Sequence, residues 1–229
     1  MRLLIACCSA CLLAALSVDA SANAGGGMSM PSTSMPSRQA TPQDKARDAY
    51  NDGVHHVKKA DKAQQTASEA TDSGKKDKAA KEAHDAYASA LGKFKESAGL
   101  DPSLAEAWNY IGYTSRKLGN YDDALAAYDR ALSLKPGYPD ALEYRGEAYL
   151  SVGRIADAQQ AYLDLYAGNR ALAGKLLTAM KSWVTAQHER PSGSGATNLD
   201  ELDKWIQERT QIAAQTAALT REGTAASWR

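Results

Sequence analysis

Cysteine and histidine, whose side chains serve as nucleophiles, proton carriers and metal ligands, are few in this sequence. Three cysteines lie near the N-terminus, at Cys7, Cys8 and Cys11. Four histidines are spread along the chain, at His55, His56, His84 and His188. His56 and His84 would meet only if two helices paired in a suitable register, and two histidines are still an incomplete metal site. We therefore predict no metal centre and no cofactor.

Catalytic and phosphate-binding motifs are also missing. The sequence contains no glycine-rich phosphate loop, no serine nucleophile elbow and no paired-histidine metalloprotease helix. Its 27 basic and 27 acidic residues balance and the pI is near 6.9, so no basic surface for nucleic acid is expected. These features predict a protein that is not an enzyme and does not bind nucleic acid.

Residues 1–24 have the pattern of a secretory signal peptide. Arg2 is basic, Leu3–Val18 is apolar apart from two serines, and small residues follow. The apolar stretch is shorter than the ~20 residues of a membrane-spanning helix. We predict cleavage after Ala22 or Ala24, a periplasmic or secreted mature chain, and no later membrane contact. Cleavage would remove all three cysteines, and with them any disulfide or thiolate ligand.

A lipoprotein-type interpretation of Leu4–Cys7 is disfavoured, because it leaves only a few apolar residues before the cysteine. Residues 25–43 are rich in glycine, serine and proline and lack apolar periodicity, which predicts a flexible linker. The linker contains Met28, Met30 and Met35, whose soft thioethers suit copper, although no histidine or cysteine lies nearby. A metal- or small-ligand-handling protein, using these methionines or the histidines at 55, 56 and 84, is therefore the alternative function.

The elements that position the remaining polar residues are expected to be helices. Alanine makes up about a fifth of the chain, whereas valine and isoleucine together make up only a few per cent. The stretch 105–138 aligns with the stretch from residue 139 onward at a spacing of 34 residues. The paired positions are Gly112 and Gly146, Gly119 and Gly153, Ala124 and Ala158, and Tyr128 and Tyr162. Each copy predicts a helical hairpin whose small residues let the two helices approach closely.

This pattern resembles the tetratricopeptide repeat, a 34-residue helical hairpin. The residues that carry the resemblance are Trp108, Gly112, Ala124, Tyr128, Ala131 and Pro136. The second copy, 139–170, keeps the small residues and the aromatic at 162, but has Leu142 and Leu165 in place of an aromatic and an alanine. The resemblance implies an all-α fold, a short solenoid of two clear repeats, one degenerate extended unit and C-terminal capping helices.

The degenerate unit, 44–104, is predicted to contain a long antiparallel hairpin. Small residues recur at steps of three and four, interrupted at His56, at Ala46, Ala49, Gly53, Ala60, Ala63, Ala67 and Ala70. A matching series follows at Ala79, Ala83, Ala86 and Ala90. Asp72–Gly74 is the expected turn, and the hairpin should project about 18 Å beyond an ordinary repeat. Its many lysines and acids favour a solvated surface, with an acidic partner or a headgroup layer as the second interpretation.

Residues 171–220 are predicted to cap the solenoid with two helices. An amphipathic helix carries Leu172, Leu176, Met180 and Trp183 and should end near Gln187, before the Pro191–Gly195 loop. Asn198 and Glu201 predict a capping box for a last helix that carries Leu199, Leu202, Trp205, Ile206 and Ile212. Residues 221–229 are expected to be frayed, with Trp228 exposed.

The resemblance also implies a binding groove lined by the first helix of each unit. Its positions fall on Tyr50, Val54, Val57 and Lys58; on Glu106, Asn109, Tyr113, Arg116 and Lys117; and on Asp140, Glu143, Glu147, Leu150 and Ser151. The candidate partner-binding residues among them are Tyr50, Asn109, Tyr113, Arg116, Lys117, Glu143 and Glu147. Asn109 and Tyr113 stand where the carboxylate clamp of some family members needs lysine and asparagine, so a chaperone-tail receptor is disfavoured.

The groove is predicted to carry different polar groups in its two repeats, with hydroxyl and amide groups in one and two carboxylates in the next. Such a surface suits a basic peptide or helix better than an acidic one. The leading hypothesis is an exported, non-enzymatic scaffold that binds a protein or peptide partner in the cell envelope. Self-association through the long hairpin or the capping helices stays open, because three units only just form a stable solenoid.

Overall fold

The computed structural model describes residues 40–189 and 199–226. These residues form eight α-helices and no strand: α1 (Pro42–Glu69), α2 (Ser73–Leu100), α3 (Ala105–Lys117), α4 (Tyr121–Leu134), α5 (Pro139–Ser151), α6 (Ile155–Gly168), α7 (Arg170–His188) and α8 (Leu199–Ala226). The predicted all-α fold is confirmed. Several sequence predictions lie outside the described residues, namely the signal peptide, the cysteines, the linker methionines, the Pro191–Gly195 loop, Asn198 and Trp228.

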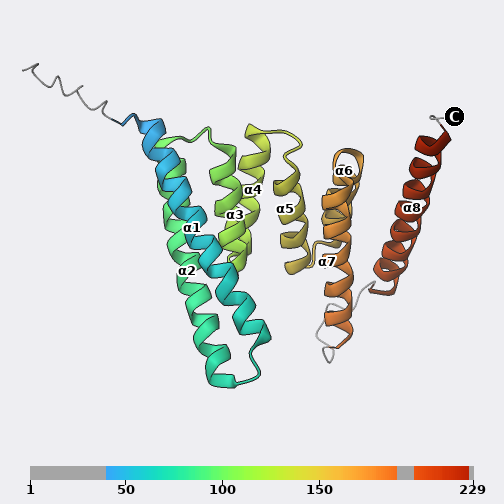
Figure 1. Cartoon of the computed structure of the whole chain (residues 1–229), viewed down its shortest axis with the longest axis horizontal. Helices are drawn as coiled ribbons and strands as arrows, with labels where there is room; N and C mark the ends of the chain where they lie inside the picture. Colours follow the sequence, from blue (N-terminus) through green and yellow to red (C-terminus); the bar gives the residue numbers. More distant parts are fainter. Residues whose placement is uncertain (1–39, 190–198, 227–229) are drawn as a thin grey trace, which may run out of the picture. The chain divides into compact units, whose positions relative to one another are not determined.

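Each helix packs against the next one along the chain, and α5 also contacts both α3 and α7 directly. Figure 1 shows the resulting order of hairpins, α1–α2, α3–α4 and α5–α6, followed by α7 and α8. The odd-numbered helices α1, α3, α5 and α7 therefore form one layer of a solenoid, and α2, α4 and α6 form the other. None of the described helices is long and apolar enough to cross a membrane.

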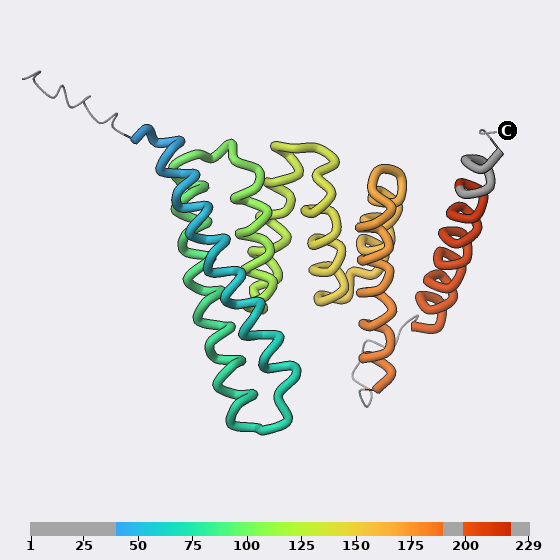
Figure 2. The backbone as a smooth tube through the Cα atoms, in the orientation of Figure 1, coloured from blue at the N-terminus to red at the C-terminus, as the bar shows by residue number. Residues whose placement is uncertain are grey.

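The first hairpin is about twice as long as the others (Figure 2). Both α1 and α2 contain 28 residues, against 13 in α3, a difference of about 22 Å of helix. The hydroxyl of Thr41 accepts a hydrogen bond from the backbone N–H of Asp44, whose carboxylate accepts from that of Thr41. This capping box starts α1 at Pro42, two residues inside the predicted linker. Asp72 caps α2, so Ser73 and Gly74 belong to its first turn.

The long hairpin is held by a seam of small residues, as the sequence predicts. The alanines of α2 in the seam are all buried, and so are those of α1 from 46 to 67. The sequence placed His56 in the seam, as an interruption of the small residues. This was wrong, because Val57 is the buried seam residue of that turn and His56 is half-buried at the edge of the seam. Gly53 lets the buried ring of Phe94 approach, and the hydroxyl of Ser97 donates to the carbonyl of Ala46 at 2.8 Å.

The two repeats share the same turn but not the same close approach, because Gly112 lies against Tyr128 of its own hairpin, whereas Gly146 lies against Leu176 of α7 and not against α6 as the sequence predicted. Gly119 and Gly153 have φ of 81° and 75°, a left-handed conformation that favours glycine. Each turn is closed by a backbone bond of 2.9 Å, from Asn120 to Ser115 and from Arg154 to Tyr149. The equivalence over 34 residues thus extends to the backbone.

The helices α7 and α8 follow the second repeat. The side chain of Asn169 accepts from the backbone N–H of Leu172 and starts α7, whose buried residues are Ala173, Leu176, Leu177, Met180 and Val184. Trp205 of α8 packs edge-on against Tyr162, with ring centroids 5.2 Å apart. Ile212, predicted on the apolar face, is 39% exposed, and α8 runs to Ala226 where a frayed tail was expected from residue 221.

Candidate functional site

Four tyrosines form a continuous row across α1, α3 and α5. Ring centroids are 5.6 Å apart between Tyr50 and Tyr110, 6.2 Å between Tyr110 and Tyr113, and 5.1 Å between Tyr113 and Tyr144. All four rings are half-buried. Burial raises the pKa of Tyr50 and Tyr144 to about 12, so their hydroxyls stay neutral at physiological pH. This tyrosine row offers aromatic surface and hydroxyl groups on the layer of odd-numbered helices.

One end of the row is fastened to the long hairpin through Asp61. One carboxylate oxygen of Asp61 accepts hydrogen bonds from the hydroxyls of Tyr87, at 2.6 Å, and Tyr113, at 2.8 Å. The side-chain oxygen of Gln64 accepts from the ammonium of Lys117 at 2.9 Å. Burial, and then the hydrogen bond to Asp61, raise the pKa of Tyr113. We call these five residues the hairpin latch, because they join α1 and α2 to α3.

Removal of one latch hydrogen bond should loosen the hairpin. We expect Tyr113→Phe to lower the free energy of unfolding by about 1–2 kcal/mol, because the carboxylate of Asp61 loses one of its two phenol donors. Hydrogen exchange in residues 58–67 should quicken more than exchange in α5. Tyr121→Phe is the matched control, since that phenol is half-exposed and outside the latch. Equal exchange in both variants would show that the latch does not fix the hairpin.

The centre of the layer is held by an ion pair. The guanidinium of Arg116 on α3 donates to the carboxylate of Glu147 on α5 at 2.6 Å, and the side chains are only 14% and 25% exposed. The same guanidinium lies 5.7 Å from the ring centroid of Tyr113 and 5.8 Å from that of Tyr144. Burial lowers the pKa of Arg116, but Glu147 and neighbouring tyrosines more than offset this. The two charges therefore neutralise each other within the protein, while the Nε–H of Arg116 is buried without a hydrogen-bond partner among the described residues.

Glu143, one turn before Glu147, has no such partner. The residue is 4% exposed, and no hydrogen bond or ion pair reaches its carboxylate from the part of the chain that the structure describes. Burial, and then the charge of Glu147, raise the pKa of Glu143 to about 7, against a weaker opposing effect of Lys175 and Arg116. Glu143 lines an open hollow of about 600 Å³ between α5 and α7.

The predicted groove residues differ in their burial and in their contacts. Tyr50, Tyr113, Arg116, Lys117 and Glu147 lie together on the odd-numbered layer, joined by the contacts above. Asn109 is 2% exposed and its side-chain oxygen is buried without a partner among the described residues, so it is not open groove surface. Val57 and Leu150 are also buried, Val54 and Asp140 are half-buried, and Lys58 and Ser151 are exposed. The carboxylate of Glu106 accepts a hydrogen bond from the ammonium of Lys135 at 3.0 Å.

Sequence reasoning missed Tyr110, Tyr144 and Asp61. Tyr110 and Tyr144 occupy the same place in the two 34-residue repeats, which is a signal that the sequence contains. Asp61 was grouped with the solvated charges of the hairpin, although its partners lie 26 and 52 residues away. Nothing local to residue 61 reveals those partners.

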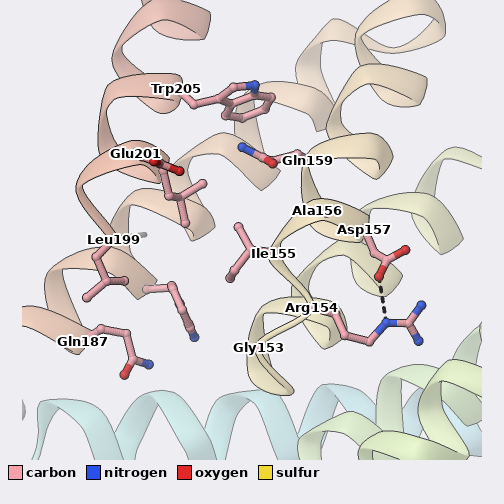
Figure 3. Close-up of a pocket in the computed structure, with 12 residues that line it drawn as sticks. Gly153, Arg154, Ile155, Ala156, Asp157, Gln159, Gln187, Leu199, Glu201 and Trp205 are labelled. Atoms are coloured by element: carbon pink, nitrogen blue, oxygen red, sulfur yellow. Dashed lines mark hydrogen bonds and ion pairs between the residues drawn. The ribbon is translucent and has the colours of Figure 1, made fainter. Parts of the chain in front are cut away.

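A second hollow, of about 770 Å³, lies between α6, α7 and α8. In Figure 3, Leu199, Glu201 and Trp205 of α8 line one side, and Gly153–Asp157 and Gln159 line the other. The charged side chains on the α6 side pair with each other, since Arg154 donates to Asp157 at 2.8 Å. The hollow thus offers apolar and indole surface but no unpaired charge on α6.

The histidines do not gather into a metal site. His56 and His84 line different hollows of the long hairpin, and His84 lies 3.6 Å from its neighbour Asp85. His55 and His188 are exposed. Across residues 40–189 and 199–226, no three histidine, cysteine or acidic side chains are close enough to hold a metal ion.

The sequence was compared with known families, curated proteins and solved structures. Residues 105–138 match the family model of the tetratricopeptide repeat, and they correspond to α3, α4 and the turn up to Tyr138. No curated protein matches the chain. A solved structure described as "TPR2B-domain:pHsp70-complex of yeast Sti1" is 17% identical, with 72% of this chain and 98% of that chain covered and a TM-score of 0.38. The described residues form an all-α solenoid that contains one tetratricopeptide repeat, at 105–138.

Proposed function

We propose that this protein is a scaffold without catalytic activity, and that its odd-numbered helix layer binds a positively charged segment of another protein. One observation carries the proposal. The tyrosine row lies on the same helix layer as Glu143, a buried residue whose carboxylate has no partner among the described residues. Tyrosine faces attract cations, and a carboxylate without a partner is stabilised by one. An extended or helical segment with lysines or arginines therefore fits this face.

The charges around the row support the same choice of partner. Glu106 and Asp140 are close enough to Tyr50 to raise the pKa of its hydroxyl, after the larger effect of burial. Arg116 is already paired with Glu147, so it does not repel an incoming cation as a free guanidinium would. On α5 the carboxylates of Asp140 and Glu143 have no ion pair among the described residues, whereas the unpaired cations Lys117 and Lys175 lie on α3 and α7, so a positively charged segment fits best along α5.

The cell envelope is the proposed location. Arg2, the apolar stretch Leu3–Val18 and the alanines at 22 and 24 support an export signal. The repeat at 105–138 supports protein binding as the role, because single hairpins of this kind stack into surfaces that hold peptides or helices. An adaptor of other envelope proteins is the simplest function that joins the two.

Affinity capture from an envelope extract tests this proposal. The bait is the chain without residues 1–24, compared with an Asp140→Lys and Thr178→Lys variant that adds two lysines to the proposed binding face and removes one carboxylate. We expect the variant to lose at least one specific protein that the native chain retains. The control is Ala126→Lys with Gln160→Lys, at exposed positions of α4 and α6. Retention by the face variant, or equal loss by the control, would contradict binding through this face.

A further inference from the structure

The carboxylate of Glu143 is unusual because it is buried without a partner. The residue as a whole is only 4% exposed, and its carboxylate reaches the open hollow between α5 and α7, yet neither a backbone N–H nor a basic side chain of the described chain bonds to it. An ionised carboxylate in such surroundings is unfavourable unless a cation or a hydrogen-bond donor approaches. A ligand can therefore stabilise the carboxylate of Glu143 by bringing a cation or a hydrogen-bond donor to it.

The side of α7 that faces Glu143 leaves room for such a ligand. The residues of α7 that line the hollow are mostly small, namely Ala171, Gly174, Thr178, Ala179 and Ser182, with one lysine at 175. A Cβ added at Gly174 would meet nothing within 4 Å. The hollow thus combines an open, mostly small-residue wall on α7 with a buried carboxylate on α5.

Among the charged groups around the hollow, Glu143 is the buried carboxylate that has no ion-pair partner. On α5, Glu147 is already paired with Arg116 of α3, and Asp140 adds further negative charge. On α7, Lys175 is exposed and forms no ion pair with Glu143. A cation entering the hollow would therefore meet one unpaired buried carboxylate and one exposed lysine.

We infer that the hollow between α5 and α7 is a subsite for one lysine or arginine side chain of the partner, which forms an ion pair with Glu143. This inference rests on the proposed function. The aliphatic stem of such a side chain packs against Ala171 and Ala179 while its charged end reaches the carboxylate. A bare metal ion fits less well, because no third acidic or histidine ligand of the described chain joins Glu143 and Glu147.

The subsite makes partner binding depend on pH near neutrality. Burial, followed by Glu147, raises the pKa of Glu143 to about 7, and Lys175, Arg116 and Asp140 are the other charged groups that act on it. The carboxyl group must lose its proton before it can pair with a cation. Affinity for a basic ligand is therefore expected to be about tenfold weaker at pH 6 than at pH 8.

Calorimetric titration with a defined probe tests the subsite. The probe is a peptide of alternating lysine and serine, and its alanine-for-lysine analogue is the blank. At pH 8 we expect Glu143→Gln, an isosteric change, to weaken binding about tenfold and to remove the difference between pH 6 and pH 8. Lys175→Met should strengthen binding, because it removes the competing positive charge. Circular dichroism checks that each variant keeps its helical content.

The outcomes separate the subsite from the wider proposal. If Asp140→Lys weakens binding but Glu143→Gln binds like the native protein at both pH values, the subsite is wrong and the binding face stands. If the native protein does not bind the probe, or Asp140→Lys binds it equally well, both the subsite and the face are wrong. Tenfold loss in Glu143→Gln with an unchanged pH difference would also overturn the subsite, since it would assign the pH dependence to another group.

Discussion

Replacing Gly112 with alanine is expected to lower the free energy of unfolding by about 3 kcal/mol. The new Cβ would lie 2.5 Å from the nearest carbon of the Tyr128 ring, which is fully buried and has no open side to move toward. Overpacking of a filled core costs about 1–3 kcal/mol or more, and this contact is at the severe end because α3 and α4 would have to separate. The helix propensity of alanine offsets less than 1 kcal/mol of that cost.

Gly92→Ala is the matched control for this prediction. Gly92 also lies inside a helix, but a Cβ there meets nothing within 4 Å, so alanine should stabilise the protein by about 0.5–1 kcal/mol. Urea unfolding followed by circular dichroism measures both variants. Opposite signs would support the close approach of α3 and α4. A Gly112→Ala protein as stable as Gly92→Ala would contradict the packing of this hairpin.

Glu143→Gln is expected to stabilise the protein at pH 8 by on the order of 2–3 kcal/mol, and very little at pH 4.5. The folded-state pKa of Glu143 is raised from 4.5 to about 7, with burial as the main cause. The folded state therefore binds the proton more tightly than the unfolded state. Stability from this group is greatest at low pH and is lost as pH rises from about 4.5 to 7. Glutamine keeps the shape of the side chain without the buried charge.

Unfolding by urea at several pH values measures this difference. Glu82→Gln is the control, because Glu82 is half-exposed and 3.7 Å from Lys59, and removing it should change stability by no more than about 1 kcal/mol at any pH. A constant difference between native and Glu143→Gln proteins from pH 4.5 to pH 8 would show that Glu143 is not buried as a charge. The same variant thus gains stability where it is expected to lose binding.

Local patterns in the sequence predicted the helices and the repeat well. The glycines at 119 and 153 end helices through their own backbone conformation, so their positions can be recognised without knowledge of the fold. The alanine seam was also recognisable, because small residues at helical spacing must face a partner helix. Its register at Val57 instead of His56 depends on which residue of α2 lies opposite, and that information is not local.

The candidate site was predicted less completely, for a physical reason. The resemblance to the tetratricopeptide repeat placed Tyr113, Arg116 and Glu147 on the same layer, and the structure brings them into contact. It did not indicate that Asn109 and Glu143 would be buried, because their burial depends on neighbouring helices. The latch at Asp61 joins residues from three helices, so only the assembled hairpins reveal it.

The claim that the tyrosine-lined layer binds a positively charged segment can be tested without knowing the natural partner. The most direct measurement is selection of short peptides from a random displayed library against the native protein, followed by binding of the selected peptides to Asp140→Lys with Thr178→Lys. We expect the selected peptides to be enriched in lysine or arginine and to lose affinity at least tenfold for the variant. Enrichment of acidic or uncharged peptides, or peptides that bind the variant equally well, would contradict the account.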